Sequence, residues 1–163
     1  AFSAVYRMHH NAVYRFALHM SGNGHVAEEV TQEVFLLLMR ETRSFDARRG
    51  SLGAYLYGIA RNFVRRQLER DRAWDTIEDT TAGPVSPGDP LSELTRRETI
   101  ESVRQAILTL PPNYREAVVL CELQELSYEE AAAAIGCAVG TVRSRLHRGR
   151  AILIVKLQSR CLV

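Results

Sequence analysis

A break near the middle of the sequence limits what this chain of 163 residues can fold into. The stretch DTIEDTTAGPVSPGDP, residues 75–90, has no hydrophobic periodicity and contains three prolines and two glycines. This composition is typical of a linker and not of a helix or strand. We therefore expect two small domains, residues 1–74 and 92–163, joined by a flexible linker over residues 75–91.

Charge is unevenly distributed between these segments, although the formal net charge is only +2. Eight arginines lie between Arg43 and Arg72, and six lysines and arginines without a single acid lie between Thr141 and Arg160. Residues 75–93 contain five acids and no base. Two basic blocks joined by an acidic connector favour two surfaces that face nucleic acid, although solvated charged faces are also common in other proteins.

Apolar residues recur at helical spacing in both halves, and no β-hairpin pattern is present. The fold class we predict is all-α, with two small helical domains. A first helix should end at the breaker cluster Ser21–Gly24, and Ser51 can cap a long helix that runs to about Arg72. The other predicted helices cover residues 26–42, 91–110 and 112–123.

The predicted helix after Ser51 has two different faces. Its apolar face should pack on the two preceding helices, whereas the opposite face offers cations, an aromatic ring and an amide to an anionic partner. The apolar set is Leu52, Leu56, Ile59, Ala60 and Phe63, and the opposite set is Tyr57, Gly58, Arg61, Asn62, Arg65 and Arg72.

A helix–turn–helix is predicted near the C-terminus. Ser127 and Glu130 have the spacing of a capping box, in which each side chain binds a free backbone N–H of the first turn. Four alanines, residues 131–134, allow another helix to approach closely, and Gly136 suits the left-handed position that ends a helix. A second helix should begin near Thr141, which is the spacing of a DNA-binding helix–turn–helix.

The second helix of this motif also separates into faces. Its basic side can enter a major groove, where arginines pair with guanine edges or phosphates. A solvated basic helix is the alternative, and the capping box, the alanines and the glycine turn argue against it. The inward set is Val139, Val142, Leu146, Gly149 and Leu153; Ser144, His147 and Arg148 point outward, flanked by Arg143 and Arg150.

These motifs resemble those of one known family. The stretch LPPNYREAVVLCELQELSYEEAAAAIGCAVGTVRSRLHRGRAIL is similar to the C-terminal promoter-reading domain, region four, of extracytoplasmic-function (ECF) sigma factors. In the first half, AEEVTQEVFLLLMR and FDARRGSLGAYLYGIARNFVRRQLERDR are similar to region two of that family. The resemblance covers nearly the whole chain, and the linker lies where the family has one.

The resemblance implies an RNA polymerase sigma factor that binds the core enzyme, at its β′ clamp helices and β flap, and directs promoter recognition, melting and transcription initiation. It also implies control by an anti-sigma factor. Gln32 and Glu33 would face the polymerase. Arg143, Ser144, His147 and Arg148 would read the minus-thirty-five element as duplex. The minus-ten element would be met by Phe45, Arg48, Arg49, Tyr57, Arg61, Asn62 and Arg65.

Two of these minus-ten assignments have ordinary structural alternatives. Tyr57 can instead be a half-buried packing residue, and Asn62 a solvated helix residue. For the whole chain, one rival is a response regulator, which would need a βαβ receiver domain that the first half does not suggest. A second rival is a sigma-like decoy that binds an anti-sigma factor without touching DNA, but a decoy has no need of two arginine-rich faces.

An enzyme is the third class considered. The five histidines never combine with acids or cysteines at metal-ligand spacing, and no phosphate-binding loop or nucleophile motif is present. We therefore expect no catalysis, no cofactor and no metal. The cysteines Cys121, Cys137 and Cys161 form no CxxC pair and are expected to be buried or idle thiols. A redox role for Cys121 with Cys137 is the alternative. Without a long apolar run or a signal-peptide pattern, we expect a cytoplasmic chain with no membrane insertion.

Overall fold

The computed structural model describes residues 1–41, 45–48, 50–75 and 92–161, and in these ranges it contains helices and no strand. The all-α prediction is confirmed. The predicted linker, apart from Asp75, lies outside the described residues. The elements are α1 (Phe2–Ser21), α2 (Gly24–Arg40), α3 (Leu52–Asp75), α4 (Ser92–Leu108), α5 (Pro112–Val118), a π-helical turn η1 (Val119–Leu123), α6 (Tyr128–Ile135) and α7 (Val139–Cys161).

Local capping explains where the helices of the first half begin and end. Gly22 adopts a left-handed conformation with φ 68°, and its N–H donates to the Leu18 carbonyl oxygen at 2.7 Å, which closes α1. The Asn23 side chain accepts from the N–H of His25, so α2 begins two residues earlier than its apolar pattern indicates. Ser51 Oγ accepts from the N–H of Ala54 at 3.1 Å, which confirms the predicted cap of α3.

The second half differs from prediction at one element. The predicted helix 112–123 is α-helical as far as Val118 and then widens into η1, where the Gln124 N–H donates to the Val119 carbonyl oxygen. Pro112 occupies the first turn of α5, where the missing N–H has no cost. The chain then enters the capped helix α6.

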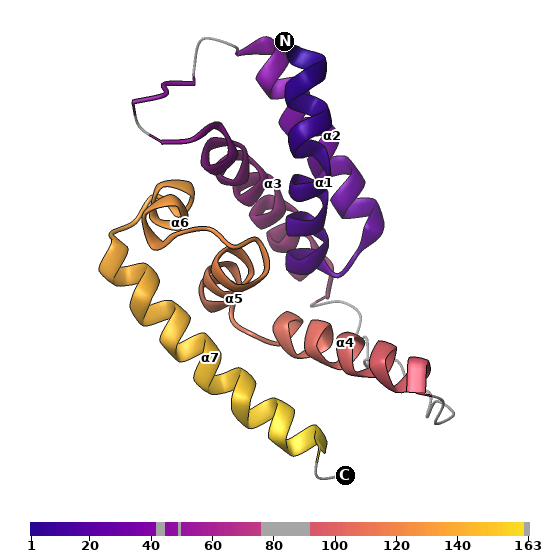
Figure 1. Cartoon of the computed structure of the whole chain (residues 1–163). Coiled ribbons are helices and arrows are strands. Elements are labelled where there is room, and N and C mark those ends of the chain that lie inside the picture. The colour runs from indigo at the N-terminus through magenta and orange to yellow at the C-terminus, as the bar shows by residue number, and fades with distance from the viewer. Residues whose placement is uncertain (42–44, 49, 76–91, 162–163) are drawn as a thin grey trace.

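The two halves pack against each other. Helices α1, α2 and α3 form one bundle, and α4 to α7 form a second, with α6 against α3 and α4 against α1 (Figure 1). A continuous cluster of buried apolar side chains runs through both bundles, from Phe16 and Leu56 in the first to Leu120 and Val142 in the second. The arrangement therefore places one face of α3 against the second bundle.

Candidate nucleic-acid interface

The helix–turn–helix is built by α6 and α7. Ser127 Oγ accepts from the Glu130 N–H at 3.1 Å, and a Glu130 side-chain oxygen accepts from the Ser127 N–H at 3.2 Å. Gly136 ends α6 with φ 81°. The capping box and the glycine stop are thus confirmed, and α7 begins at Val139, two residues before the expected position.

Helix α7 presents the predicted basic face to solvent. Arg143, Ser144, His147 and Arg148 are all exposed, whereas Val142, Leu146 and Gly149 are buried against α5 and its surroundings. Two of the arginines are held by aromatic side chains of the same half. The Arg143 guanidinium lies 5.6 Å from the ring centre of Tyr128, and Arg148 Nη1 donates to the Tyr114 hydroxyl at 3.4 Å.

The residues proposed for the minus-ten element are divided between two environments. Phe45 lies beside Tyr55, with ring centres 5.4 Å apart, and Arg48 and Asn62 are exposed. A hollow of about 470 Å³ lies beside Phe45 and Tyr55, between Asp46, the start of α3 and Ala133 of α6. Arg49 lies outside the described residues.

Tyr57, Arg61 and Arg65 form the second group and lie where α3 meets the second half. Tyr57 is 8% exposed, and its hydroxyl donates to Gln124 Oε1 at 3.0 Å. Burial raises the pKa of the Tyr57 phenol. In this arrangement Tyr57 is buried and Asn62 is exposed, which are the environments of the structural alternatives given for both residues.

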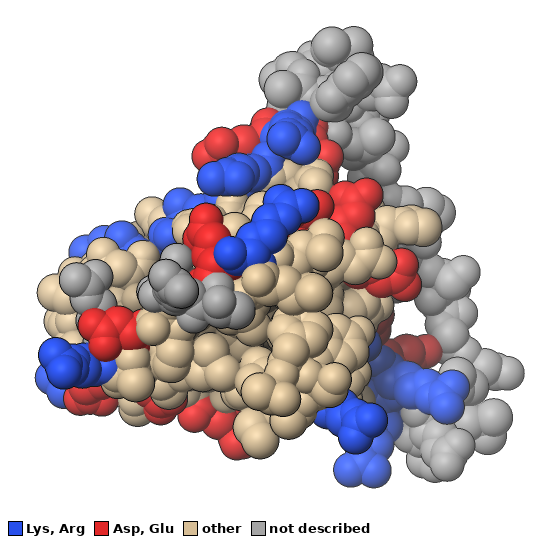
Figure 2. Space-filling view, turned by 90° about the horizontal axis from the view of Figure 1, so that it is seen from above, with Lys and Arg blue, Asp and Glu red and all other residues tan. Residues whose placement is uncertain are grey.

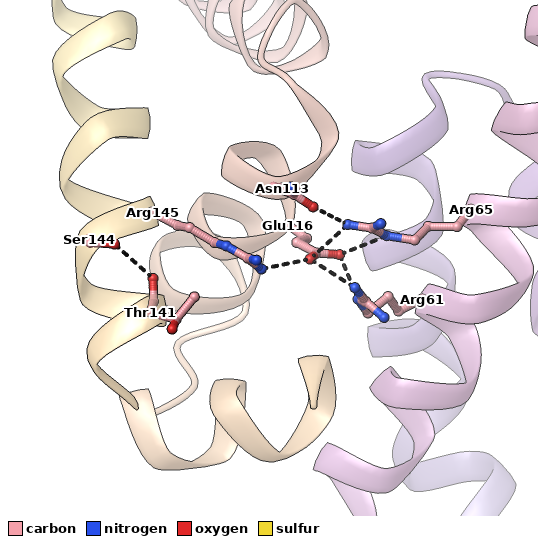
Figure 3. Close-up of polar contacts among 7 residues, drawn as sticks. All are labelled: Arg61, Arg65, Asn113, Glu116, Thr141, Ser144 and Arg145. Atoms are coloured by element: carbon pink, nitrogen blue, oxygen red, sulfur yellow. Dashed lines mark hydrogen bonds and ion pairs between the residues drawn. The ribbon is translucent and has the colours of Figure 1, made fainter. Parts of the chain in front are cut away.

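Arg61 and Arg65 converge on a carboxylate of α5 (Figure 3). Arg61 Nε donates to Glu116 Oε2 at 2.7 Å, and Arg65 Nη2 donates to Glu116 Oε1 at 3.0 Å. Arg65 Nη2 also donates to Asn113 Oδ1 at 2.5 Å, and Arg145 Nη1 of α7 lies 3.7 Å from Glu116 Oε1. The Glu116 side chain is fully buried.

Sequence reasoning missed Glu116 and its contact with Arg145. A weak signal was available, because Glu116 shares the helical face of Val119 and Leu120, which are apolar and buried. A carboxylate in an apolar stripe must find cationic partners or lose its charge, since burying an unpaired charge is costly. The pattern does not say which half of the chain supplies the partners.

Gln32 and Glu33, predicted to face the polymerase, are both exposed on α2. Leu36 and Met39 follow on the same helix and are 44% and 57% exposed. Figure 2 looks onto the end of the molecule at which α1 begins, and there residues other than Lys, Arg, Asp and Glu form a broad area with charged residues of both signs around it. The exposed part of α2 is therefore a mixed polar and apolar surface.

The described residues contain no cluster of three or more His, Cys, Asp or Glu side chains that could hold a metal ion. In the same part of the chain, no helix is long and apolar enough to span a bilayer. Cys121 and Cys137 are free thiols, and burial raises the pKa of Cys121.

Comparison with known proteins adds the family. Residues 5–74 match the family Sigma-70 region 2, and residues 100–153 match Sigma-70, region 4. The ECF RNA polymerase sigma factor SigW of Bacillus subtilis is 31% identical to this chain, over 97% of this chain and 89% of SigW. The chain belongs to the ECF family of RNA polymerase sigma factors. The family membership that the sequence motifs implied is confirmed.

Other relatives agree with this assignment. The ECF RNA polymerase sigma factor SigE of Mycolicibacterium smegmatis is 37% identical over 88% of this sigma factor, which spans 56% of the length of SigE. The solved structure of the sigma factor RpoE with the anti-sigma factor NepR, from Bartonella quintana, matches with a TM-score of 0.75 at 27% identity over 96% of each chain. CnrH, solved with the cytosolic domain of CnrY, has a TM-score of 0.72 at 23% identity and supports the fold alone.

Proposed function

We propose that this sigma factor binds core RNA polymerase, reads the minus-thirty-five element with α7 and opens the minus-ten element with the 45–51 loop and α3. The observation that carries the proposal is the exposed row Arg143, Ser144, His147 and Arg148 on the second helix of a capped helix–turn–helix. Duplex DNA suits this face because arginine and histidine donors can reach base edges or phosphates in a major groove.

For the minus-ten element we propose the two groups described above. Aromatic rings stack on unpaired bases, amides read base edges and arginines bind phosphates. Phe45, Arg48 and Asn62 are accessible in the described arrangement, whereas Tyr57, Arg61 and Arg65 contact the second half. Arg49, outside the described residues, belongs to the same proposal.

Core binding is proposed for Gln32 and Glu33 on α2, at the β′ clamp helices, and for the second half at the β flap. The exposed Leu36 and Met39 beside them support a protein partner, because apolar side chains exposed near polar ones are a common feature of binding surfaces. We also propose control by an anti-sigma factor, as in the RpoE–NepR complex, a cytoplasmic location and no catalysis by the chain itself. The boundaries 1–74, 75–91 and 92–163 remain predictions.

Run-off transcription with core polymerase on genomic DNA fragments tests the proposal. We expect start sites that core polymerase alone does not produce. Arg148→Ala should lower transcription from them by fivefold or more, since losing one arginine contact to a guanine costs roughly 1–3 kcal/mol. Arg104→Ala is the matched control, because Arg104 is 52% exposed on α4 and carries the same charge.

Absence of any new start site would contradict the proposed function. A footprint of the promoter with and without core polymerase separates the sigma factor from the decoy alternative, because a decoy protects no DNA in either case. Equal losses in Arg148→Ala and Arg104→Ala would mean that α7 acts through net charge and does not read the promoter.

A further inference from the structure

A fully buried carboxylate lies where the two halves of this sigma factor meet. Glu116 is on α5, and its two closest cationic partners, Arg61 and Arg65, come from α3 in the other half. The third partner, Arg145, comes from α7 and lies further away, at 3.7 Å. Burying a charge is costly unless it is paired and hydrogen-bonded, so the burial of Glu116 depends on the two arginines of the first half.

Neighbouring contacts fix the same arrangement. Arg115, next to Glu116, donates from Nη1 to the Met20 carbonyl oxygen at 2.6 Å, at the end of α1. Tyr57 donates to Gln124 across the same boundary. Gly58 of α3 lies so close to α6 that a Cβ atom there would be 3.0 Å from the Ala134 carbonyl oxygen. Hydrogen bonds and a close backbone approach therefore hold one specific packing.

The chemistry of this contact resembles that expected for promoter DNA. A guanidinium binds carboxylate and phosphate oxygens with the same paired N–H donors. Arg61 and Arg65 are 17% and 31% exposed and face Glu116, so in this arrangement the carboxylate occupies donors that phosphates would need.

We propose that Glu116 is an intramolecular latch, which holds the two halves together through Arg61 and Arg65 and keeps these arginines and Tyr57 away from promoter DNA. The masking part of this proposal rests on the proposed function. Opening separates α5 and α6 from α3, leaves Glu116 with Arg145 of its own half and frees Arg61 and Arg65. Closure and binding of the minus-ten strand are then mutually exclusive, and DNA competes with the latch for the same donors.

Small-angle X-ray scattering of the full chain tests the latch without DNA. A compact chain of this length has a radius of gyration of about 15 Å, and two separated domains would give roughly 20 Å. We expect Glu116→Gln to shift the chain from the first value toward the second, because three arginines would then meet without a carboxylate. Glu122→Gln is the matched control: Glu122 makes an exposed ion pair with Arg150 inside the second half, and its loss should leave the chain compact.

A second variant tests the closed arrangement independently, in case Glu116→Gln does not fold. Gly58→Gln keeps every charge and favours helix, but its side chain would meet the Ala134 backbone in the closed arrangement alone. We expect the same expansion, with the helix content of both variants unchanged by circular dichroism. An extended wild-type chain overturns the latch, and so does a folded Glu116→Gln variant that stays compact.

Masking is tested with a fluorescein-labelled single strand that carries the non-template sequence upstream of a mapped start site. Glu116→Gln should bind this strand about tenfold more tightly than the wild type, and Glu122→Gln, which makes the same change in net charge, should not. If the variants open and affinity is unchanged while wild-type run-off transcription succeeds, masking is wrong. If the variants open but neither strand binding nor any new start site is detected, the proposed function fails and the latch stands.

Discussion

His19 is a titratable residue at the place where α1 packs on α4. It is half-buried and lines an apolar groove with Ile100, Val103 and Leu123. Burial lowers the pKa of His19 below its ordinary value of 6.5, and the positive charges of Arg104 and Arg15 lower it further. The neutral imidazole is therefore the form that the folded chain favours.

The first prediction concerns stability in acid. Because the folded pKa of His19 is lowered, the unfolded chain binds more protons as pH falls through 6.5. The free energy of unfolding should decrease from that point and level off below the folded pKa. Urea titrations between pH 8 and pH 5 in the wild type and in His19→Gln check this, and the variant should show a flatter dependence. Parallel curves for the two proteins would contradict it.

At the scale of the elements, Gly149 allows a close approach of α7 to α5. A Cβ atom at this position would lie 2.7 Å from Val118 Cγ2 and 3.4 Å from the Tyr114 carbonyl oxygen. Val118 is buried and has little room to move. The absent side chain at residue 149 thus sets how closely α7 approaches α5 and, with it, the position of the outward Arg148.

The second prediction compares two glycines of α7. Gly149→Ala should lower the free energy of unfolding by about 1–3 kcal/mol through overpacking. Gly140→Ala should raise it by about 0.5 kcal/mol, because a Cβ atom there meets nothing within 4 Å and alanine favours helix. Urea unfolding of both variants measures the difference. Equal effects of the two substitutions would mean that the contact between α5 and α7 accommodates the added Cβ atom without loss of stability.

Local signals explain which elements could be predicted from the sequence. Ser51, Ser127 and Gly136 each act within a few residues of their own position, and each begins or ends a helix as predicted. The inward and outward faces of α7 follow from helical geometry and were also predicted. No local pattern marks the widening of the helix at Val119–Leu123, which therefore went unpredicted.

The candidate site was predicted less completely, for a physical reason. An arginine-rich helix face suits phosphates and carboxylates equally, so Arg61 and Arg65 could be identified as anion-binding residues but not assigned to Glu116. Their contacts with it span 55 and 51 residues of sequence. A contact of that range depends on how two helical bundles dock, which the periodicity of either bundle does not encode.

For the whole molecule, the two halves share one apolar core although a linker is predicted between them. Buried side chains from α1, α2 and α3 are continuous with those of α4, η1, α6 and α7. Glu116 and Arg115 add polar contacts across the same boundary. Neither half can separate without exposing part of this core, so the stability of each half is coupled to that of the other.

The third prediction follows from this coupling. The wild-type chain should unfold in a single calorimetric transition, with a calorimetric enthalpy equal to the van't Hoff enthalpy. Glu116→Gln should divide it into two transitions, because the halves then melt as separate bundles with different stabilities, whereas Glu122→Gln should keep one. Two transitions in the wild type would show that the shared core contributes little free energy. A single, merely shifted transition in Glu116→Gln would show that apolar burial alone holds the halves together, and the role given to the Glu116 latch would then be wrong.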